Sequence, residues 1–436
     1  MIGFVGLSHL GLNYSLATAA KGFDVVAYDP DTELVRRLQA GEFPIEEPGF
    51  RELHERHHSK LRYTSDAADL ASCNLVFYSL DVRTNAGNES DLGPLTALIQ
   101  NTDPSLASTA TAVVLSQVRP GYTRELAARL GTHAGRWYYQ VETLIFGSAV
   151  QRAMEPERYI VGAPRTEVPL PEAYAAWARA FGCPVLVMRY ESAELAKIAI
   201  NFFLVSSVST TNTLAGICEA IGADWAEIAP ALRLDKRIGP HAYLKPGLGI
   251  AGGNLERDLV TVQGLASGYG VEAGIVDAWQ RSSAHSRFWA LRVLERELLA
   301  ARPTSRIAVW GLAYKQDTHS IRNSASVELI RTISGCDIHA YDPAAHVESA
   351  LFSNLTVHAS ALEALAGADA LAVMTPWKEF SAIAPSEIRR VMKGKLVVDP
   401  YCVLDRGGCA SLGIELYQMG SPAPGKVPAR DGKRSP

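Results

Sequence analysis

The chain has 436 residues, of which 47% are hydrophobic and 20% are charged, and its formal net charge is −4. Chains of this length fold as two or three domains rather than around one core. The composition is that of a globular protein, and the mild charge without a basic, aromatic-rich cluster argues against nucleic acid as a partner. We find no apolar run of the ~18 residues that a membrane span needs and no signal peptide. Because the six cysteines lack metal-ligand spacing, we expect free thiols, no metal site and a cytoplasmic protein.

The N-terminal half begins with a β-α-β pattern. A short apolar strand over 2–5 leads into a glycine turn over 6–11, a helix over 12–21 that ends at Gly22, and a second strand over 24–28. Further strands are predicted over 74–79, 112–116 and 159–162, with helical stretches between them. This alternation predicts a parallel, doubly wound sheet.

The middle of the chain has a different texture. Residues 191–222 form a long helical pattern whose apolar face is suited to a subunit interface, which predicts a homodimer. The α/β alternation restarts near residue 305, with strands predicted over 306–310, 337–341, 370–374 and 396–398. We therefore predict an α/β protein with two Rossmann-like domains, at 1–188 and 301–419, joined by a helical region at 189–300. Residues 420–436, rich in Pro, Gly, Lys and Arg, are predicted to be a disordered tail.

The glycine turn resembles G-x-G-x-x-G, with Ser8 in place of the middle glycine. Such a turn lets the backbone approach a pyrophosphate at a helix N-terminus. Asp29 ends the second strand, at the spacing of a ribose-binding carboxylate, and favours NAD over NADP. We therefore predict an NAD site; the competing interpretation is that the Cβ of Ser8 leaves the fold empty. The predicted cofactor contacts from the turn are Gly6, Ser8, His9, Leu10 and Gly11.

Several further motifs, in order, resemble those of the UDP-glucose/GDP-mannose 6-dehydrogenase family over about residues 1–410. They are Glu46-Glu47-Pro48-Gly49, Val141-Glu142-Thr143-Leu144, Glu194-Leu195-Ala196-Lys197 with Asn201, Arg237-Ile238-Gly239, Pro246-Gly247-Leu248-Gly249, Gly311-Leu312-Ala313-Tyr314-Lys315 with Thr318 and Arg322, and Tyr341-Asp342-Pro343. The resemblance implies an NAD domain, a helical dimerisation region and a domain that binds a nucleotide sugar. It also implies two successive hydride transfers, in which a cysteine captures the intermediate aldehyde and a thioester is hydrolysed to an acid.

Three positions depart from this family in the covalent half of the mechanism. The segment that resembles the family's G-G-x-C-F-P-K-D reads Gly253-Asn254-Leu255-Glu256-Arg257-Asp258 at its end. When the two aspartates are matched, Asn254 stands at the position of the nucleophilic cysteine. A carboxamide cannot form a thioester. Gln117 replaces the Thr associated with the hydrolytic water, and Phe146 replaces the second Glu of P-E-F-L-R-E-G. We also count Gln117 among the cofactor-binding residues.

The residues that the hydride step needs are retained. Lys197 and Asn201 are one helical turn apart, and Asp258 is kept. A Lys–Asn–Asp cluster can polarise an alkoxide or carbonyl oxygen, and Lys197, or a water held by Lys197 and Asp258, could accept the hydroxyl proton. Glu142 is a second candidate acid or base. The predicted catalytic residues are thus Lys197, Asn201, Asp258, Glu142 and Asn254.

The substrate side is a mixture of retained and altered positions. Glycines let the backbone approach a sugar or diphosphate, and the candidates are Gly247, Gly249, Gly252 and Gly253. Arg237 and Lys315 are candidate diphosphate contacts, and Arg322 is expected to bind or brace the nucleotide domain. Tyr401 stands where the family has the Arg of D-x-R-N, which leaves the identity of the substrate open.

Four functions remain compatible with these observations. The first is a single NAD-dependent oxidation of a nucleotide sugar or related nucleoside to an aldehyde or ketone. The second is secondary-alcohol oxidation or redox epimerisation with retained NAD. The third is a non-catalytic protein that binds a nucleotide sugar, and the fourth is ordinary acid formation by another route.

Overall fold

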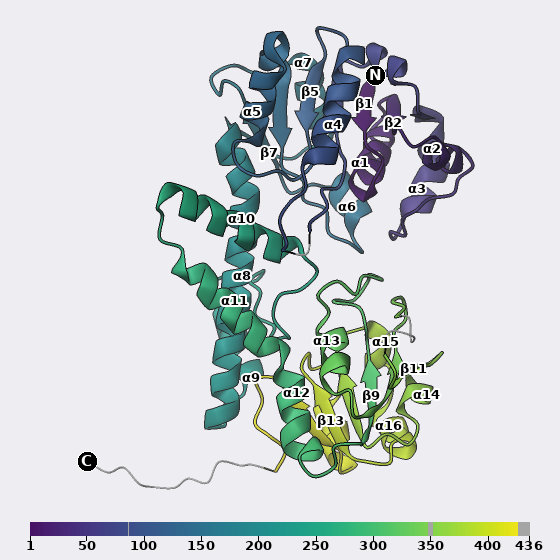
Figure 1. Cartoon of the computed structure of the whole chain (residues 1–436), viewed down its shortest axis with the longest axis vertical. Coiled ribbons are helices and arrows are strands. Elements are labelled where there is room, and N and C mark those ends of the chain that lie inside the picture. The colour runs from purple at the N-terminus through teal and green to yellow at the C-terminus, as the bar shows by residue number, and fades with distance from the viewer. Residues whose placement is uncertain (86, 348–351, 426–436) are drawn as a thin grey trace. The chain divides into compact units, whose positions relative to one another are not determined.

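The structure, a computed structural model, describes residues 1–85, 87–347 and 352–425. It divides into two compact units, Met1–Ile200 and Asn201–Pro436, which appear in Figure 1 in purple to teal and in teal to yellow. Each unit contains one large sheet, so the predicted α/β class with two Rossmann-like sheets and a long helix is confirmed. The two units are described separately below.

The sheet of the first unit has eight strands in the order β3-β2-β1-β4-β5-β6-β7-β8. Its first six strands have the 3-2-1-4-5-6 order of a dinucleotide-binding fold. The strands are β1 (Ile2–Val5), β2 (Val25–Tyr28), β3 (Leu61–Thr64), β4 (Leu75–Tyr78), β5 (Thr111–Val114), β6 (Trp137–Gln140), β7 (Tyr159–Ala163) and β8 (Val185–Arg189).

One pair in this sheet departs from the predicted parallel arrangement. Strands β6 and β7 are antiparallel, with Tyr139 opposite Gly162 and Gln140 opposite Val161, whereas the other neighbouring strands described in this sheet pair in parallel. An antiparallel pair needs no crossover back to the other edge of the sheet. The segment between β6 and β7 therefore starts and ends at the carboxyl edge of β1, where the glycine turn lies.

Helices cover both faces of this sheet (Figure 1). They are α1 (His9–Ala20), α2 (Thr32–Gln39), α3 (Phe50–His57), α4 (Gly93–Thr102), α5 (Tyr122–Arg129), α6 (Ala149–Met154) and α7 (Glu172–Ala180). The six inner strands are buried along their whole length, whereas the edge strands β3 and β8 are partly exposed, and three hydrophobic clusters of the described residues form the core. In one of them Trp177 of α7 stacks on Tyr159 at 5.0 Å between ring centroids, which fixes α7 on β7.

The second unit has a parallel six-stranded sheet in the order β11-β10-β9-β12-β13-β14. Its strands are β9 (Arg306–Trp310), β10 (Asp337–Tyr341), β11 (Leu355–Val357), β12 (Ala370–Val373), β13 (Leu396–Asp399) and β14 (Glu415–Gln418). The helices around it are α13 (Ala325–Thr332), α14 (Ala361–Leu365), α15 (Lys378–Ser381), α16 (Pro385–Val391) and α17 (Arg406–Ser411).

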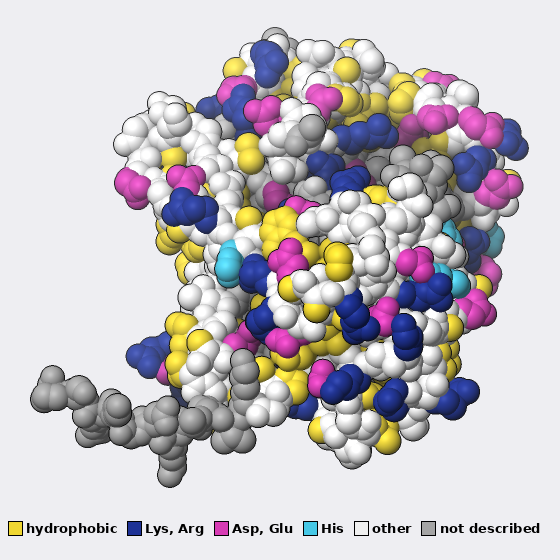
Figure 2. Space-filling view, turned by 60° about the horizontal axis from the view of Figure 1, so that its bottom comes forward, with side chains coloured by type: hydrophobic (Ala, Val, Ile, Leu, Met, Phe, Trp, Pro, Cys, Tyr) yellow, Lys and Arg dark blue, Asp and Glu magenta, His cyan; other side chains and the backbone are white. Residues whose placement is uncertain are grey.

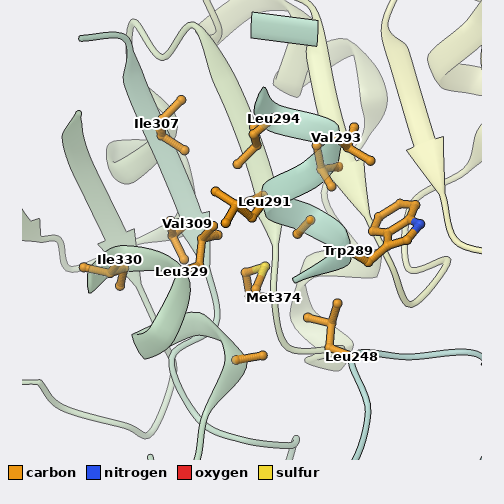
Figure 3. Packing of buried hydrophobic residues seen from close by; sticks show 14 of the residues in the cluster. Leu248, Trp289, Leu291, Val293, Leu294, Ile307, Val309, Leu329, Ile330 and Met374 are labelled. Carbon is orange, nitrogen blue, oxygen red and sulfur yellow. The ribbon is translucent and has the colours of Figure 1, made fainter. Parts of the chain in front are cut away.

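Four more helices of the second unit precede this sheet, and at least one of them shares its core. They are α9 (Trp225–Leu234), α10 (Asn254–Tyr269), α11 (Gly274–Arg287) and α12 (Trp289–Leu294). Figure 3 shows Leu291 and Leu294 of α12 in one cluster with Ile307 and Val309 of β9, together with Leu248. The predicted boundary at residue 300 thus crosses a continuous hydrophobic core.

Helix α8 (Tyr190–Ile221) matches the predicted long helix to within one residue at each end. By length and composition alone it could cross a membrane, which corrects our expectation that no stretch would qualify; core helices pass the same test. A third of its most apolar window is buried. Tyr190 and Ala193 belong to the core of the first unit, and Ala215 and Cys218 to that of the second, so α8 is part of both cores.

The predicted tail needs a corrected starting point. Gly420 and Ser421 are buried, and the backbone of Gly420 accepts from Trp225 N at 2.9 Å and donates to Glu219 at 2.8 Å. A Cβ at Gly420 would lie 2.9 Å from Trp225 Cβ. Gly420 is therefore packed against the second unit, although the composition of the segment had placed it in the predicted tail. Residues 426–436 lie outside the described residues.

On the face drawn in Figure 2, acidic and basic side chains are interspersed.

Candidate functional site

The glycine turn of the first unit joins β1 to α1 and leaves no room for larger residues. Gly6 has φ +92°, and a Cβ there would lie 3.0 Å from Leu80 N. A Cβ at Gly11 would lie 2.0 Å from the carbonyl oxygen of Gly6. The helix therefore packs directly on the turn, and its N-terminal amide groups are presented at the carboxyl edge of the sheet. This cradle fits the pyrophosphate of a dinucleotide.

Ser8 uses its hydroxyl group within the protein. The hydroxyl donates to the carbonyl oxygen of Ser79 at 3.1 Å and accepts from Asp81 N at 2.8 Å. A serine hydroxyl at this place could donate to a phosphate, but here its proton is directed to the carbonyl oxygen of Ser79. The Ser8 side chain instead connects the turn after β1 to the segment after β4.

Asp29 at the end of β2 holds the turn from the other side. Its carboxylate accepts from Leu7 N at 2.7 Å and from Asp31 N at 3.0 Å. Burial raises the pKa of Asp29, and these two backbone donors act against that rise. The predicted ribose-binding residue is thus positioned directly beside the glycine turn.

His9, at the start of α1, is enclosed by the segment between β6 and β7. Its Nε2 lies 2.8 Å from Glu47, whose carboxylate also accepts from Gly147 N at 3.0 Å and Ala149 N at 3.2 Å. The ring of Phe146 packs on His9 at 4.2 Å between centroids. Motif comparison located Glu47 but gave it no role; here it ties the segment 147–149 to the glycine turn.

Glu142 and Lys197 form an ion pair within the first unit. Lys197 Nζ lies 2.7 Å from Glu142 Oε1 and also donates to the carbonyl oxygen of Glu142 at 3.1 Å. The second carboxylate oxygen accepts from Leu144 N at 3.0 Å. Both side chains are largely buried, at 14% and 16% exposed. Gln117, which follows β5, is partly buried at the carboxyl edge of the same sheet.

In the second unit the four predicted loop glycines all lie against other segments. A Cβ on each of them would lie close to a neighbouring side chain: at Gly247 2.9 Å from Tyr401, at Gly249 2.6 Å from Ser283, at Gly252 2.4 Å from Tyr314 and at Gly253 2.7 Å from Arg322. Gly249, Gly252 and Gly253 also have positive φ. The loop can take this path only as glycine, and Arg322 braces it.

Asn254 is the first residue of helix α10 and is exposed. The sequence pattern placed it in a loop, but the loop ends at Gly253. Glu256 closes the helix start by accepting from Gly253 N at 2.8 Å and from Asn323 at 3.0 Å. The carboxamide of Asn254 therefore lies at the N-terminus of α10.

Asn201 and Asp258 were predicted to lie together and are hydrogen-bonded. Asn201 Nδ2 donates to Asp258 Oδ2 at 2.5 Å, and Arg257 Nε lies 3.5 Å from Asp258 Oδ1. Asp258 is only 2% exposed. Such a buried carboxylate needs donors of this kind to remain in place, so α10 and α8 are joined by a polar contact.

A cavity of about 230 Å³ lies beside the glycine loop in the second unit. Its wall is mostly apolar and contains Lys315 and two aromatic side chains; the lining residues are Val208, Leu248, Gly249, Ile250, Ala251, Leu255, Ala313, Tyr314, Lys315, Ala325, Met374 and Tyr401. Burial raises the pKa of Tyr401 to about 12, so its phenol is neutral at physiological pH. This wall of the cavity is therefore a neutral aromatic ring.

Arg237 lies apart from this cavity. Its side chain is 89% exposed and is paired with Asp235 at 2.6 Å. Within the described part of the second unit it does not line the pocket, so this chain alone does not place it as a diphosphate contact.

The cysteines offer no substitute nucleophile among the described residues. Cys73, Cys218, Cys336 and Cys409 are buried, and none of the six is disulfide-bonded. Desolvation raises the pKa of the exposed Cys402 to about 12, which is the opposite of what a reactive thiolate needs. In the ranges that the structure describes, no three His, Cys, Asp or Glu side chains are grouped to hold a metal.

Comparisons with known proteins match every major part of the chain. Models of the UDP-glucose/GDP-mannose dehydrogenase family match residues 1–177 as the NAD binding domain, 191–284 as the central domain and 308–406 as the UDP binding domain. UDP-glucose 6-dehydrogenase of Pseudomonas aeruginosa is 30% identical over 98% of each chain. The enzyme AglM of Haloferax volcanii, also a UDP-glucose 6-dehydrogenase, is 31% identical over 93% of this chain and 97% of its own.

Solved structures share the fold over nearly the same length. A UDP-glucose dehydrogenase from Pyrobaculum islandicum superposes with a TM-score of 0.81 at 27% identity, covering 92% of this chain and 94% of that one. A UDP-D-ManNAc dehydrogenase from Pyrococcus horikoshii has the same TM-score at 23% identity, covering 96% and 99%, which concerns the fold alone.

Proposed function

Because this chain belongs to the UDP-glucose/GDP-mannose dehydrogenase family, we propose that it oxidises one alcohol group of a nucleotide sugar or related nucleoside once, and releases an aldehyde or ketone. Membership makes it an NAD-dependent oxidoreductase that acts on CH–OH groups. The proposal concerns where the reaction stops. It is carried by Asn254, which occupies the nucleophile's position at the start of α10.

The cofactor side of the reaction uses the turn after β1. When bound, NAD supplies the acceptor for the hydride. Gly6 and Gly11 let α1 pack directly on the turn. The amides of His9 and Leu10 at the start of α1 would hold the pyrophosphate, and Asp29 would bind a ribose hydroxyl.

The substrate side of the reaction needs a group that removes the hydroxyl proton and a group that stabilises the oxygen. Lys197 Nζ lies 2.7 Å from Glu142 Oε1, and both side chains are largely buried. We assign Lys197 to the developing alkoxide, where a cation in a water-poor site is most effective. Lys197 hands one of its protons to Glu142 as it takes the proton of the substrate hydroxyl, so it remains a cation beside the oxygen.

The second oxidation lacks its chemical means. Covalent capture requires a reactive thiolate. Asn254 carries a carboxamide, and the raised pKa of Cys402 keeps that side chain protonated. Phe146 lies against His9, so an apolar ring occupies the position at which the family has a second glutamate. Without covalent capture and a general base for water, the carbonyl product is the end point of the reaction.

The apolar cavity of the second unit is our proposed nucleotide-binding region. Its aromatic residues suit a base and ribose, and Lys315 is the cation available for a phosphate. The neutral phenol of Tyr401 cannot balance the charge of a phosphate. We therefore expect this cavity to favour a substrate that carries fewer phosphates than UDP-glucose.

The experiment that tests the reaction's end point is a stoichiometric one. Candidate nucleosides and nucleotide sugars are incubated with NAD, and NADH and product mass are measured in the same sample. We expect one NADH for each product and a mass lower by two hydrogens. Two NADH for each product, with an acid formed, would refute the proposal. Product formed without net NADH would indicate redox epimerisation instead, and the Lys197→Met variant serves as the inactive control.

We also propose a homodimer in the cytoplasm. Helix α8 exposes a stripe of large apolar side chains at helical spacing, namely Phe203, Leu214, Ile217 and Ile221, with Phe203 78% exposed. A second copy of α8 is the natural cover for such a stripe. Light scattering of wild type and of Phe203→Glu tests this, because the charge should shift the mass from dimer to monomer.

A further inference from the structure

The three residues that follow β4 pack directly onto the glycine turn. Ser79 Oγ donates to the carbonyl oxygen of Gly6 at 3.0 Å, and Leu80 supplies the backbone that a Cβ on Gly6 would meet at 3.0 Å. Asp81 N donates to the hydroxyl of Ser8 at 2.8 Å. Ser8 stands in place of the motif's middle glycine, so its hydroxyl provides an attachment for Asp81 that a glycine would lack.

The carboxylate of Asp81 lies at the N-terminus of α1. Its Oδ2 is 3.4 Å from Leu10 N, which belongs to the first turn of the helix. The N-terminus of a helix attracts negative charge through its unpaired amides and its dipole. In a dinucleotide-binding turn this is the position of the pyrophosphate, so Asp81 places an anion of the protein where an anion of the cofactor binds.

The surroundings make this carboxylate sensitive to further negative charge. Although Asp81 is exposed as a residue, desolvation is the largest cause of the raised pKa of its carboxyl group. Glu142 adds to the rise, while His9, Ser8 and the amide of Leu10 oppose it. A pyrophosphate would bring two more negative charges to the same amide groups.

We propose that Asp81 is an internal substitute for the cofactor's pyrophosphate and weakens the binding of NAD to this chain. The dinucleotide binds as the Asp81 side chain moves away from Leu10. A cavity of about 260 Å³, lined by Asp81, Val82, Arg83 and neighbouring residues, lies beside it and provides room for this movement. The inference rests on NAD as the cofactor and is independent of how many oxidations the enzyme performs.

The test is a set of equilibrium titrations on the full-length protein. Asp81→Asn keeps the shape of the side chain and removes its charge, so NAD should bind about tenfold more tightly, equivalent to about 1.4 kcal/mol. ADP-ribose, which has the pyrophosphate, should show the same gain, and adenosine, which lacks it, should show none. Ser8→Gly should also tighten NAD binding, because it releases the backbone of Asp81. Asp24→Asn is the matched control, since Asp24 precedes β2 at the opposite edge of the same sheet and pairs with Lys60.

Each outcome decides one question. Equal NAD affinity in wild type and Asp81→Asn overturns the inference and leaves the cofactor assignment intact. Weaker binding to Asp81→Asn also overturns it, because Asp81 would then be a ligand of the cofactor. A gain that is equally large for adenosine overturns the role of charge. If no variant binds NAD, the cofactor assignment and the inference fail together. Thermal melting of each variant, with Asp81→Ser as a second charge-free side chain, separates these results from misfolding.

Discussion

Gly252 provides the sharpest structural test of the substrate loop. Its φ is +93°, and the Cβ of an alanine there would lie 2.4 Å from Tyr314 Cε2. The left-handed backbone costs a non-glycine residue about 1–2 kcal/mol, and forcing extra volume into a packed contact costs about 1–3 kcal/mol. Gly252→Ala should therefore destabilise the second unit by about 3 kcal/mol. For a unit of roughly 200 residues this lowers the melting temperature by about 6–12 °C.

Scanning calorimetry measures this effect because it can resolve the transitions of two units. Gly264→Ala is the matched control: it lies inside α10, no atom would be near its Cβ, and the change should stabilise the helix by up to about 1 kcal/mol. In a Tyr314→Ala background the cost of Gly252→Ala should fall to the backbone part, about 1–2 kcal/mol. A Gly252→Ala protein that melts like wild type would refute the reasoning.

Three further predictions concern chemistry and pH. Lys197→Met should reduce kcat by about 10²–10⁴-fold with NAD affinity unchanged, whereas the exposed Lys60→Met should match wild type in both; equal kcat values would exclude Lys197 from catalysis. Asn254→Cys should still give one NADH for each product, because the two other substitutions in the covalent half remain; a stoichiometry of two would show that the thiol alone suffices. Burial and the neighbouring His339, 2.7 Å away, lower the pKa of His358. Because the folded state favours the neutral imidazole, protonation of His358 favours unfolding. The free energy of unfolding is therefore unaffected by this group above about pH 6.5 and decreases as the pH falls below that value. His358→Gln should flatten the acid side of the stability profile, and an unchanged slope would contradict this.

The sequence revealed the inner strands and missed the edges. Strands β1, β4, β9 and β12 are continuous buried apolar runs, which are visible without any structure. All four edge strands, β3, β8, β11 and β14, escaped prediction. All four are partly exposed, and β11 has only three residues, so neither length nor hydrophobicity distinguishes them from loops. The missed inner strand β6 is aromatic and ends in Gln140.

The candidate site was predictable where its residues share a motif. Asn201 and Asp258 came from two known motifs, and they are hydrogen-bonded. The pairing of Lys197 with Glu142 was not foreseen, although both residues came from motifs: the contact depends on where the segment after β6 lies against α8, which no motif describes. Asp81 and Glu47 had no assigned role for the same reason: their importance depends on which strand ends are neighbours in the sheet.

The reversal between β6 and β7 also has a meaning for how this enzyme family can diversify. The segment between β6 and β7 carries Glu142 and Phe146. It lies at the carboxyl edge of the sheet and contains no strand. Residues there can be exchanged at little risk to the core that folds the domain. On the proposal that the reaction stops at the carbonyl, an exchange at the exposed Phe146 alters the end point of the oxidation without disturbing the strands that build the cofactor site.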